Sequence, residues 1–132
     1  MTLEQALLDK NLNITSARLT LFKLLKNIDR PLSISEIIYQ LPRFDRSTIY
    51  RSIDAFEKIE IIKKVWFGDK YKIELSDEFN KHHHHIVCKK CSLIEKIDYK
   101  NLENIMNNIV KKHLFTSSTH HIEIIGLCKN CR

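Results

Sequence analysis

The chain has 132 residues, 43% of them hydrophobic, and a formal net charge of +6. This length suits one compact domain or two small ones. No segment approaches the roughly 18 apolar residues of a membrane-spanning helix, and no signal peptide is apparent, so we expect a cytoplasmic protein with no membrane partner. The positive charge permits a nucleic-acid partner but does not establish one.

Four helices are predicted in the first half of the chain, each starting at a side chain that can cap it. Such a Ser, Thr or Asp accepts a hydrogen bond from a backbone N–H of the first turn. The capping residues are Thr2, Thr15 and Ser33 for the first three helices, and Asp45, Ser47 or Thr48 for the fourth. Pro42 ends the third helix, and the third and fourth helices have the spacing of a helix-turn-helix.

A β-hairpin is predicted next, because the β-rich runs 61–67 and 71–75 are joined at Gly68-Asp69. Helices followed by a hairpin make a winged helix. We therefore predict a winged-helix DNA-binding domain over residues 1–76, followed by a hinge over residues 77–81.

The remaining segment, residues 82–132, is predicted to be a small α/β domain. Strands are expected near 86–87, 93–97 and 120–126, with an amphipathic helix over 99–113. A sheet with free edges and a small core favours pairing with a second copy, so this domain is expected to dimerise. The predicted fold class is α+β, with the winged helix-turn-helix domain first.

The start of the fourth helix carries polar and cationic side chains that suit the major groove of DNA. Arginine can bind phosphates or guanine, and tyrosine can contact a thymine methyl group. The candidate contacts are Arg46, Ser47, Thr48, Tyr50 and Arg51. The alternative interpretation is an ordinary solvated helix face.

All four cysteines lie in two Cys-x-x-Cys pairs, Cys88 with Cys91 and Cys128 with Cys131. In a reducing compartment such pairs are typical metal ligands, and four thiolates make a closed, structural zinc site. A redox pair is disfavoured because neither pair opens a thioredoxin-like βαβ unit. A disulfide-bonded secreted domain is the other alternative.

Four consecutive histidines precede the first cysteine pair. In an extended chain alternate side chains face opposite sides, so His82 and His84 point one way and His83 and His85 the other. With Glu103 and His120, the first two histidines make a shell of three nitrogens and one oxygen. Such a shell suits zinc, iron or manganese.

These residues together resemble the ferric uptake regulator family of metal-dependent transcription factors, over nearly the whole chain. A histidine at position 84 is similar to the zinc-responsive branch of the family. The motifs that carry the resemblance are Thr15-x-x-Arg18, Ser47-Thr48-Ile49-Tyr50-Arg51, Gly68-Asp69 with Ile73-Glu74-Leu75, the run from His82 to Cys91, Phe115 with His120, and Gly126-Leu127-Cys128-x-x-Cys131.

The resemblance implies a dimer that binds a palindromic operator on double-stranded DNA when it is loaded with metal, with Arg18 as a further DNA contact. It implies the four-cysteine structural zinc and a regulatory divalent metal at His82, His84, Glu103 and His120. It also implies a further site, at the hinge and wing, formed by Glu74, His83 and His85.

The sequence departs from the family pattern at this hinge and wing site. Residues 1–81 contain no histidine, and Lys96 stands where many members carry a carboxylate. A site of three or four ligands is therefore expected, with Glu95, Asp69 or Asp77 as candidates for the fourth.

The sequence thus predicts a metal-dependent DNA-binding regulator, a repressor rather than an enzyme. The alternatives are a metalloenzyme, which would need an open coordination position beside a general base, and a zinc store that does not bind DNA.

Overall fold

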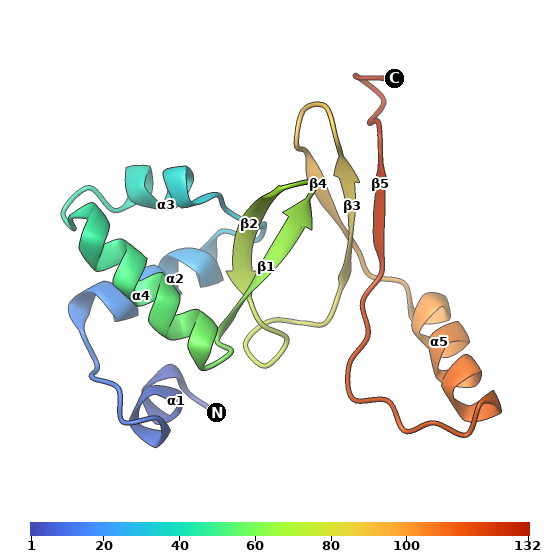
Figure 1. Ribbon diagram of the computed structural model, residues 1–132, viewed down its shortest axis with the longest axis horizontal. Helices are drawn as coiled ribbons and strands as arrows, with labels where there is room; N and C mark the ends of the chain where they lie inside the picture. The colour runs from blue at the N-terminus through green and yellow to red at the C-terminus, as the bar shows by residue number, and fades with distance from the viewer. The chain divides into compact units, whose positions relative to one another are not determined.

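The computed structural model describes residues 1–132, which divide into two compact units, Met1–Lys81 and His82–Arg132 (Figure 1). The hinge over residues 77–81 concerns motion between domains and stays a prediction. None of the helices is long and apolar enough to span a membrane.

The first unit begins with four helices; the first three are capped as predicted, and the fourth is capped by Asp45, one of its three candidates. The Thr2, Thr15, Ser33 and Asp45 side chains each accept a hydrogen bond from the backbone N–H three residues later. These caps satisfy donors that the helix leaves free in its first turn. The helices are α1 (Leu3–Asp9), α2 (Ser16–Asn27), α3 (Ile34–Gln40) and α4 (Arg46–Lys58).

The wing of the first unit is an antiparallel hairpin of β1 (Ile62–Phe67) and β2 (Lys70–Leu75). Gly68 in the turn has a φ of +67°, a conformation that glycine adopts without steric cost. Leu32 and Ile73 exchange two backbone hydrogen bonds of 2.7 and 2.8 Å, which joins the segment before α3 to the hairpin.

The core of the first unit is apolar and continuous from the helices to the hairpin. Leu7, Ile37, Phe56 and Ile73 are fully buried in it. α2 packs against α3, α4 and β2, and α4 also packs against β1. This packing holds one face of α4 inside and leaves the other face to solvent, as a winged helix-turn-helix requires.

The second unit contains β3 (His84–Cys88), β4 (Ile94–Ile97), α5 (Lys100–Lys112) and β5 (Glu123–Gly126). The strand order is β4-β3-β5; β3 pairs antiparallel with β4 and parallel with β5. The mixed α+β fold class is therefore confirmed.

The last strand is shorter than the predicted 120–126, because it starts only at Glu123. The residues before it bind side chains of the second unit. The His120 ring contacts Glu103, and the Ile122 backbone N–H donates to the His84 ring. A backbone N–H used in this way is not available to a strand ladder.

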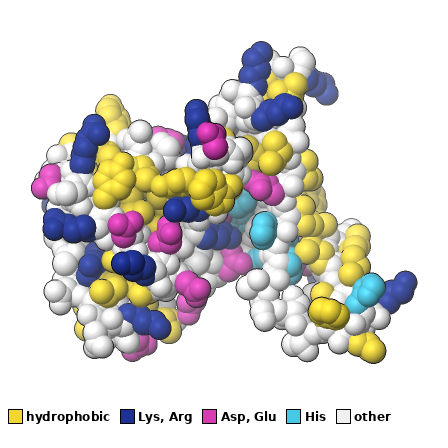
Figure 2. Space-filling view, viewed as in Figure 1, with side chains coloured by type: hydrophobic (Ala, Val, Ile, Leu, Met, Phe, Trp, Pro, Cys, Tyr) yellow, Lys and Arg dark blue, Asp and Glu magenta, His cyan; other side chains and the backbone are white.

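Helix α5 has the predicted amphipathic pattern, yet none of its residues is buried. Ile105 and Ile109 are 57% and 54% exposed. Figure 2 shows hydrophobic side chains gathered over this part of the second unit. The apolar face of α5 is therefore uncovered in the single chain.

Candidate metal centres and the exposed face of α4

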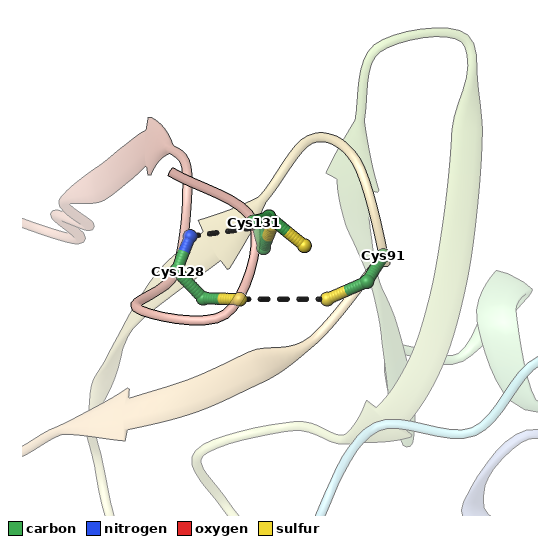
Figure 3. Close-up of side chains that lie close together, drawn as sticks. Cys91, Cys128 and Cys131 are labelled. Carbon is green, nitrogen blue, oxygen red and sulfur yellow. Dashed lines mark hydrogen bonds between the residues drawn. The ribbon is translucent and has the colours of Figure 1, made fainter.

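The four cysteine sulfurs converge at the ends of β3 and β5, as Figure 3 shows for Cys91, Cys128 and Cys131. The Cys91 and Cys128 Sγ atoms are 3.8 Å apart. Zinc–sulfur bonds of about 2.3 Å in a tetrahedron place two sulfurs about 3.8 Å apart. The spacing of this pair therefore fits zinc without rearrangement.

The thiols differ in their readiness to ionise. Backbone N–H groups of Cys91 and Cys128 donate to the Cys88 sulfur and lower the pKa of Cys88 to about 6. A hydrogen bond with Cys128 and burial raise the pKa of Cys131 to about 12. Cys88 is therefore the thiol of this pair that ionises more readily, and a cation that binds thiolates would neutralise its negative charge.

A second donor set lies at the start of β3, in the first turn of α5 and before β5. Glu103 Oε1 is 2.6 Å from His84 Nε2, and Glu103 Oε2 is 2.6 Å from His120 Nε2. His82 Nε2 is 3.1 Å from His120 Nε2 and 3.3 Å from Glu103 Oε1. All four donor atoms lie within 4.8 Å of one another, a spacing that one metal ion can bridge.

The charges of this donor set already resemble those of a loaded site. Burial tends to raise the pKa of Glu103, but hydrogen bonds with His84 and His120 outweigh it and hold that pKa below its usual value. Burial is the main cause of a lowered pKa at His84, which Glu103 only partly offsets. An ionised carboxylate and a neutral imidazole are the forms that bind metals.

The Ile122 backbone N–H fixes the His84 ring. It donates to His84 Nδ1 over 2.8 Å, so the neutral ring carries its proton on Nε2, facing Glu103. This contact is not predictable from the sequence, because a backbone donor gives no signal in the residue pattern.

The alternation predicted within the histidine run is seen in the ring contacts. His82 pairs with His120, whereas His83 Nε2 lies 3.1 Å from His85 Nε2. Glu74, the wing carboxylate, lies in β2 with its Oε1 atom 3.6 Å from Lys63 Nζ. His113 and His121 are exposed.

The outward face of α4 carries most of the predicted DNA contacts. Arg46, Ser47, Tyr50 and Arg51 are exposed, whereas Thr48 is half-buried. The Asp45 side chain accepts from the Thr48 backbone N–H over 2.8 Å and from Ser47 Oγ over 3.1 Å. A hydrogen bond with the Thr48 side chain is the largest cause that lowers the pKa of Asp45, and these two bonds and the charge of Arg51 lower it further.

Two other arginines of the first unit are held close to the protein. Arg18 Nη1 donates to the Asn13 carbonyl over 2.6 Å. Arg43, which precedes α4, donates to Ser16 Oγ over 2.7 Å. Both side chains are thus oriented by α2 or by the segment before it.

Residues 9–125 match the sequence profile of the Ferric uptake regulator family. The chain belongs to this family. The resemblance seen in the motifs is therefore confirmed. The family consists of transcription regulators rather than enzymes, so the metalloenzyme alternative is excluded.

Two curated relatives are the ferric uptake regulation protein of Bacillus subtilis and the peroxide-responsive repressor PerR of Staphylococcus epidermidis. The first is 30% identical over 82% of this chain and 76% of its own length. The second is 32% identical over 70% of this chain, and the match spans only 61% of its own length. These identities agree with the family assignment.

A solved structure, the Helicobacter pylori ferric uptake regulator, shares the fold with a TM-score of 0.83. The alignment covers 98% of this chain and 88% of that one, at 24% sequence identity. That protein has three functional metal binding sites. At this identity the likeness bears on the fold alone.

Proposed function

We propose that this protein is a dimeric, metal-dependent DNA-binding regulator that represses metal-homeostasis or stress genes in the cytoplasm. The observation that carries the proposal is the presence of two convergent donor sets in the same chain as a winged helix with an exposed polar and cationic helix face. A zinc store needs the donor sets but has no use for that helix face.

The two donor sets take different roles in this proposal. Cys88, Cys91, Cys128 and Cys131 hold a structural zinc that ties the end of the chain to β3; closed four-thiolate sites are structural. His82, His84, Glu103 and His120 hold an exchangeable divalent metal, zinc, iron or manganese. Their mixed nitrogen and oxygen donors support exchange, as does the partial exposure of His82, Glu103 and His120.

A further metal is proposed to bind Glu74, His83 and His85, the hinge and wing site. The convergence of the two histidine Nε2 atoms supports it, as does the acidic chemistry of Glu74. Since Glu74 belongs to the wing and the histidines to the second unit, a metal held by all three restricts the angle between DNA-binding and dimerisation domains.

The proposed DNA contacts are Arg18, Arg46, Ser47, Thr48, Tyr50 and Arg51. In a homodimer two copies of α4 are presented together, which suits a palindromic operator with half-sites about one helical turn, ~34 Å, or a multiple of it apart. Metal binding that fixes their separation favours the DNA-bound state through its differential affinity.

The test is operator affinity before and after removal of exchangeable metal. A palindromic duplex is first selected in vitro with the zinc-loaded dimer. Fluorescence anisotropy then compares that dimer with one that has been treated with a chelator but keeps its cysteine-bound zinc. We expect affinity to fall roughly 5- to 150-fold on metal removal. Unchanged affinity contradicts metal control, and absence of salt-dependent DNA binding favours a zinc store.

Single variants separate the two exchangeable sites. His84→Ala should weaken metal binding at the Glu103 site, and His83→Ala should weaken it at the wing site. His121→Ala, an exposed histidine beside His120, is the matched control and should leave both sites intact. An identical complete loss of response in both variants contradicts the division into two sites.

A further inference from the structure

Lys63 lies between two carboxylates of the first unit. Its Nζ atom is 2.9 Å from Asp77 Oδ1 and 3.6 Å from Glu74 Oε1. Lys63 and Glu74 are directly opposite each other across the β1–β2 ladder, so the register of the hairpin fixes their approach. Glu74 is only 3% exposed, whereas Asp77 lies at the surface with its side chain 45% exposed.

A carboxylate with so little exposure requires positive charge nearby, because it has lost most of its hydration. Lys63 supplies a cation on the wing itself, and it is present whether or not a metal is bound. A divalent ion at Glu74 and the Lys63 ammonium would therefore repel each other over a few ångströms. The shorter contact to Asp77 gives the ammonium an alternative partner.

We propose that Lys63 sets the metal affinity of the hinge and wing site by competing with the metal for Glu74, and that Asp77 relieves the competition by holding Lys63. This inference rests on the proposed role of Glu74 as a ligand. Its consequence is a threshold: only a metal that binds strongly enough to overcome a resident ammonium loads the site.

The test is zinc affinity by chelator competition, in a dimer that keeps the cysteine-bound zinc and carries His120→Ala to weaken the Glu103 site. Lys63→Met should tighten binding about tenfold, because Coulomb repulsion is removed at a site that solvent screens only in part. Asp77→Asn should weaken binding by a similar factor. Lys64→Met is the control, since Lys64 Nζ pairs with Glu57 at 3.1 Å.

The double variant separates Asp77 as a partner of Lys63 from Asp77 as a metal ligand. If Asp77 acts through Lys63, Asp77→Asn should change little once Lys63 is Met. If Asp77→Asn lowers zinc affinity tenfold both with Lys63 present and in the Lys63→Met variant, Asp77 is a direct ligand and its proposed role is overturned. Zinc affinity unchanged or weakened by Lys63→Met overturns the competition.

Thermal unfolding supplies a second readout. Lys63→Met should lower the midpoint of the metal-free protein, which loses a cation beside Glu74, and zinc should raise it more than in the parent. If Lys63→Met lowers the unfolding midpoint equally with and without zinc, Lys63 only stabilises the hairpin. If His83→Ala binds as many zinc ions per chain as the parent, the proposed hinge and wing site does not exist. That outcome is distinct from one in which the site binds zinc but Lys63 does not affect it.

Discussion

Two carboxylates of this chain, Glu36 and Glu103, both have a lowered pKa, but the groups that lower it and the roles of the two residues differ. Burial tends to raise the pKa of both Glu36 and Glu103, yet both values are lowered because hydrogen bonds and nearby positive charge outweigh it. At Glu103 the partners are histidines arranged as metal ligands. At Glu36 they are Arg30, at 2.8 Å, and the Ser33 backbone N–H of the capping box. Glu36 therefore serves the stability of the fold.

Replacing Glu36 with Gln should lower stability in a pH-dependent way. The folded-state pKa lies below the ordinary value of 4.5, so the charge stabilises the fold above that pH and the contribution is lost as pH falls through the folded pKa. We expect Glu36→Gln to cost about 0.5 kcal/mol at pH 7, because its ion pair is partly exposed.

Urea unfolding at pH 7 and at several values below 4.5 measures this difference. Glu4→Gln is the control, because Glu4 is an exposed carboxylate in the first turn of α1. A Glu36→Gln difference that stays constant as the pH falls would rule out a contribution from the charge.

At the level of elements, the two faces of α4 have different roles: one packs in the core and the other is exposed to solvent. Ile49, Ile53 and Phe56 are buried and fix the helix in the core. The Asp45 cap sets where the helix begins and so which side chains project from its first turns. The exposed face is therefore free to vary in chemistry without altering the packing.

Arg51→Ala should weaken operator binding without lowering stability by more than about 0.5 kcal/mol, because Arg51 is exposed. If Arg51 binds a phosphate, affinity falls by a similar factor for all duplexes and the slope of log affinity against log salt falls by about one. Anisotropy titrations at several salt concentrations measure both.

Lys58→Ala is the matched control for Arg51→Ala, since it removes one exposed positive charge from the other end of α4. Equal losses of affinity in the two variants would show that only net charge matters, and would contradict a specific role for the first turns of the helix.

On the scale of the whole molecule, a single chain leaves two features without a packing partner: the apolar face of α5 and the free edge of β5. Apolar side chains on this helix bury little surface in one chain. A sheet with order β4-β3-β5 leaves β5 with unpaired backbone groups along one side. Both features support the proposed homodimer.

Ile105→Glu with Ile109→Glu should convert the dimer to a monomer, because two charges on the apolar face of α5 would lose hydration at an interface. Sedimentation velocity measures the mass. Asn104→Glu with Asn108→Glu is the control: it adds the same charges to exposed neighbouring positions. A dimer that survives the isoleucine changes places the interface elsewhere.

Local sequence signals predicted most of the elements and the donor sets. Thr2, Thr15 and Ser33 mark three helix starts because capping is a contact between near neighbours, and Asp45 was one of three candidates for the fourth. The Gly68-Asp69 turn also fixes which residues oppose each other in the hairpin, so the approach of Lys63 to Glu74 was available from the sequence although it was not predicted.

By itself, the sequence determined the ligand types, the strand alternation of the histidine run and the winged-helix pattern, since these depend on spacing along the chain. The sequence also indicated Glu103 and His120 as partners of His82 and His84, and the tertiary structure gives the distances at which they meet. Only the tertiary structure decided that β5 starts late and that the Ile122 N–H orients the His84 ring. The reason is physical: these contacts join residues far apart in the chain, whose approach depends on how β3, α5 and β5 pack.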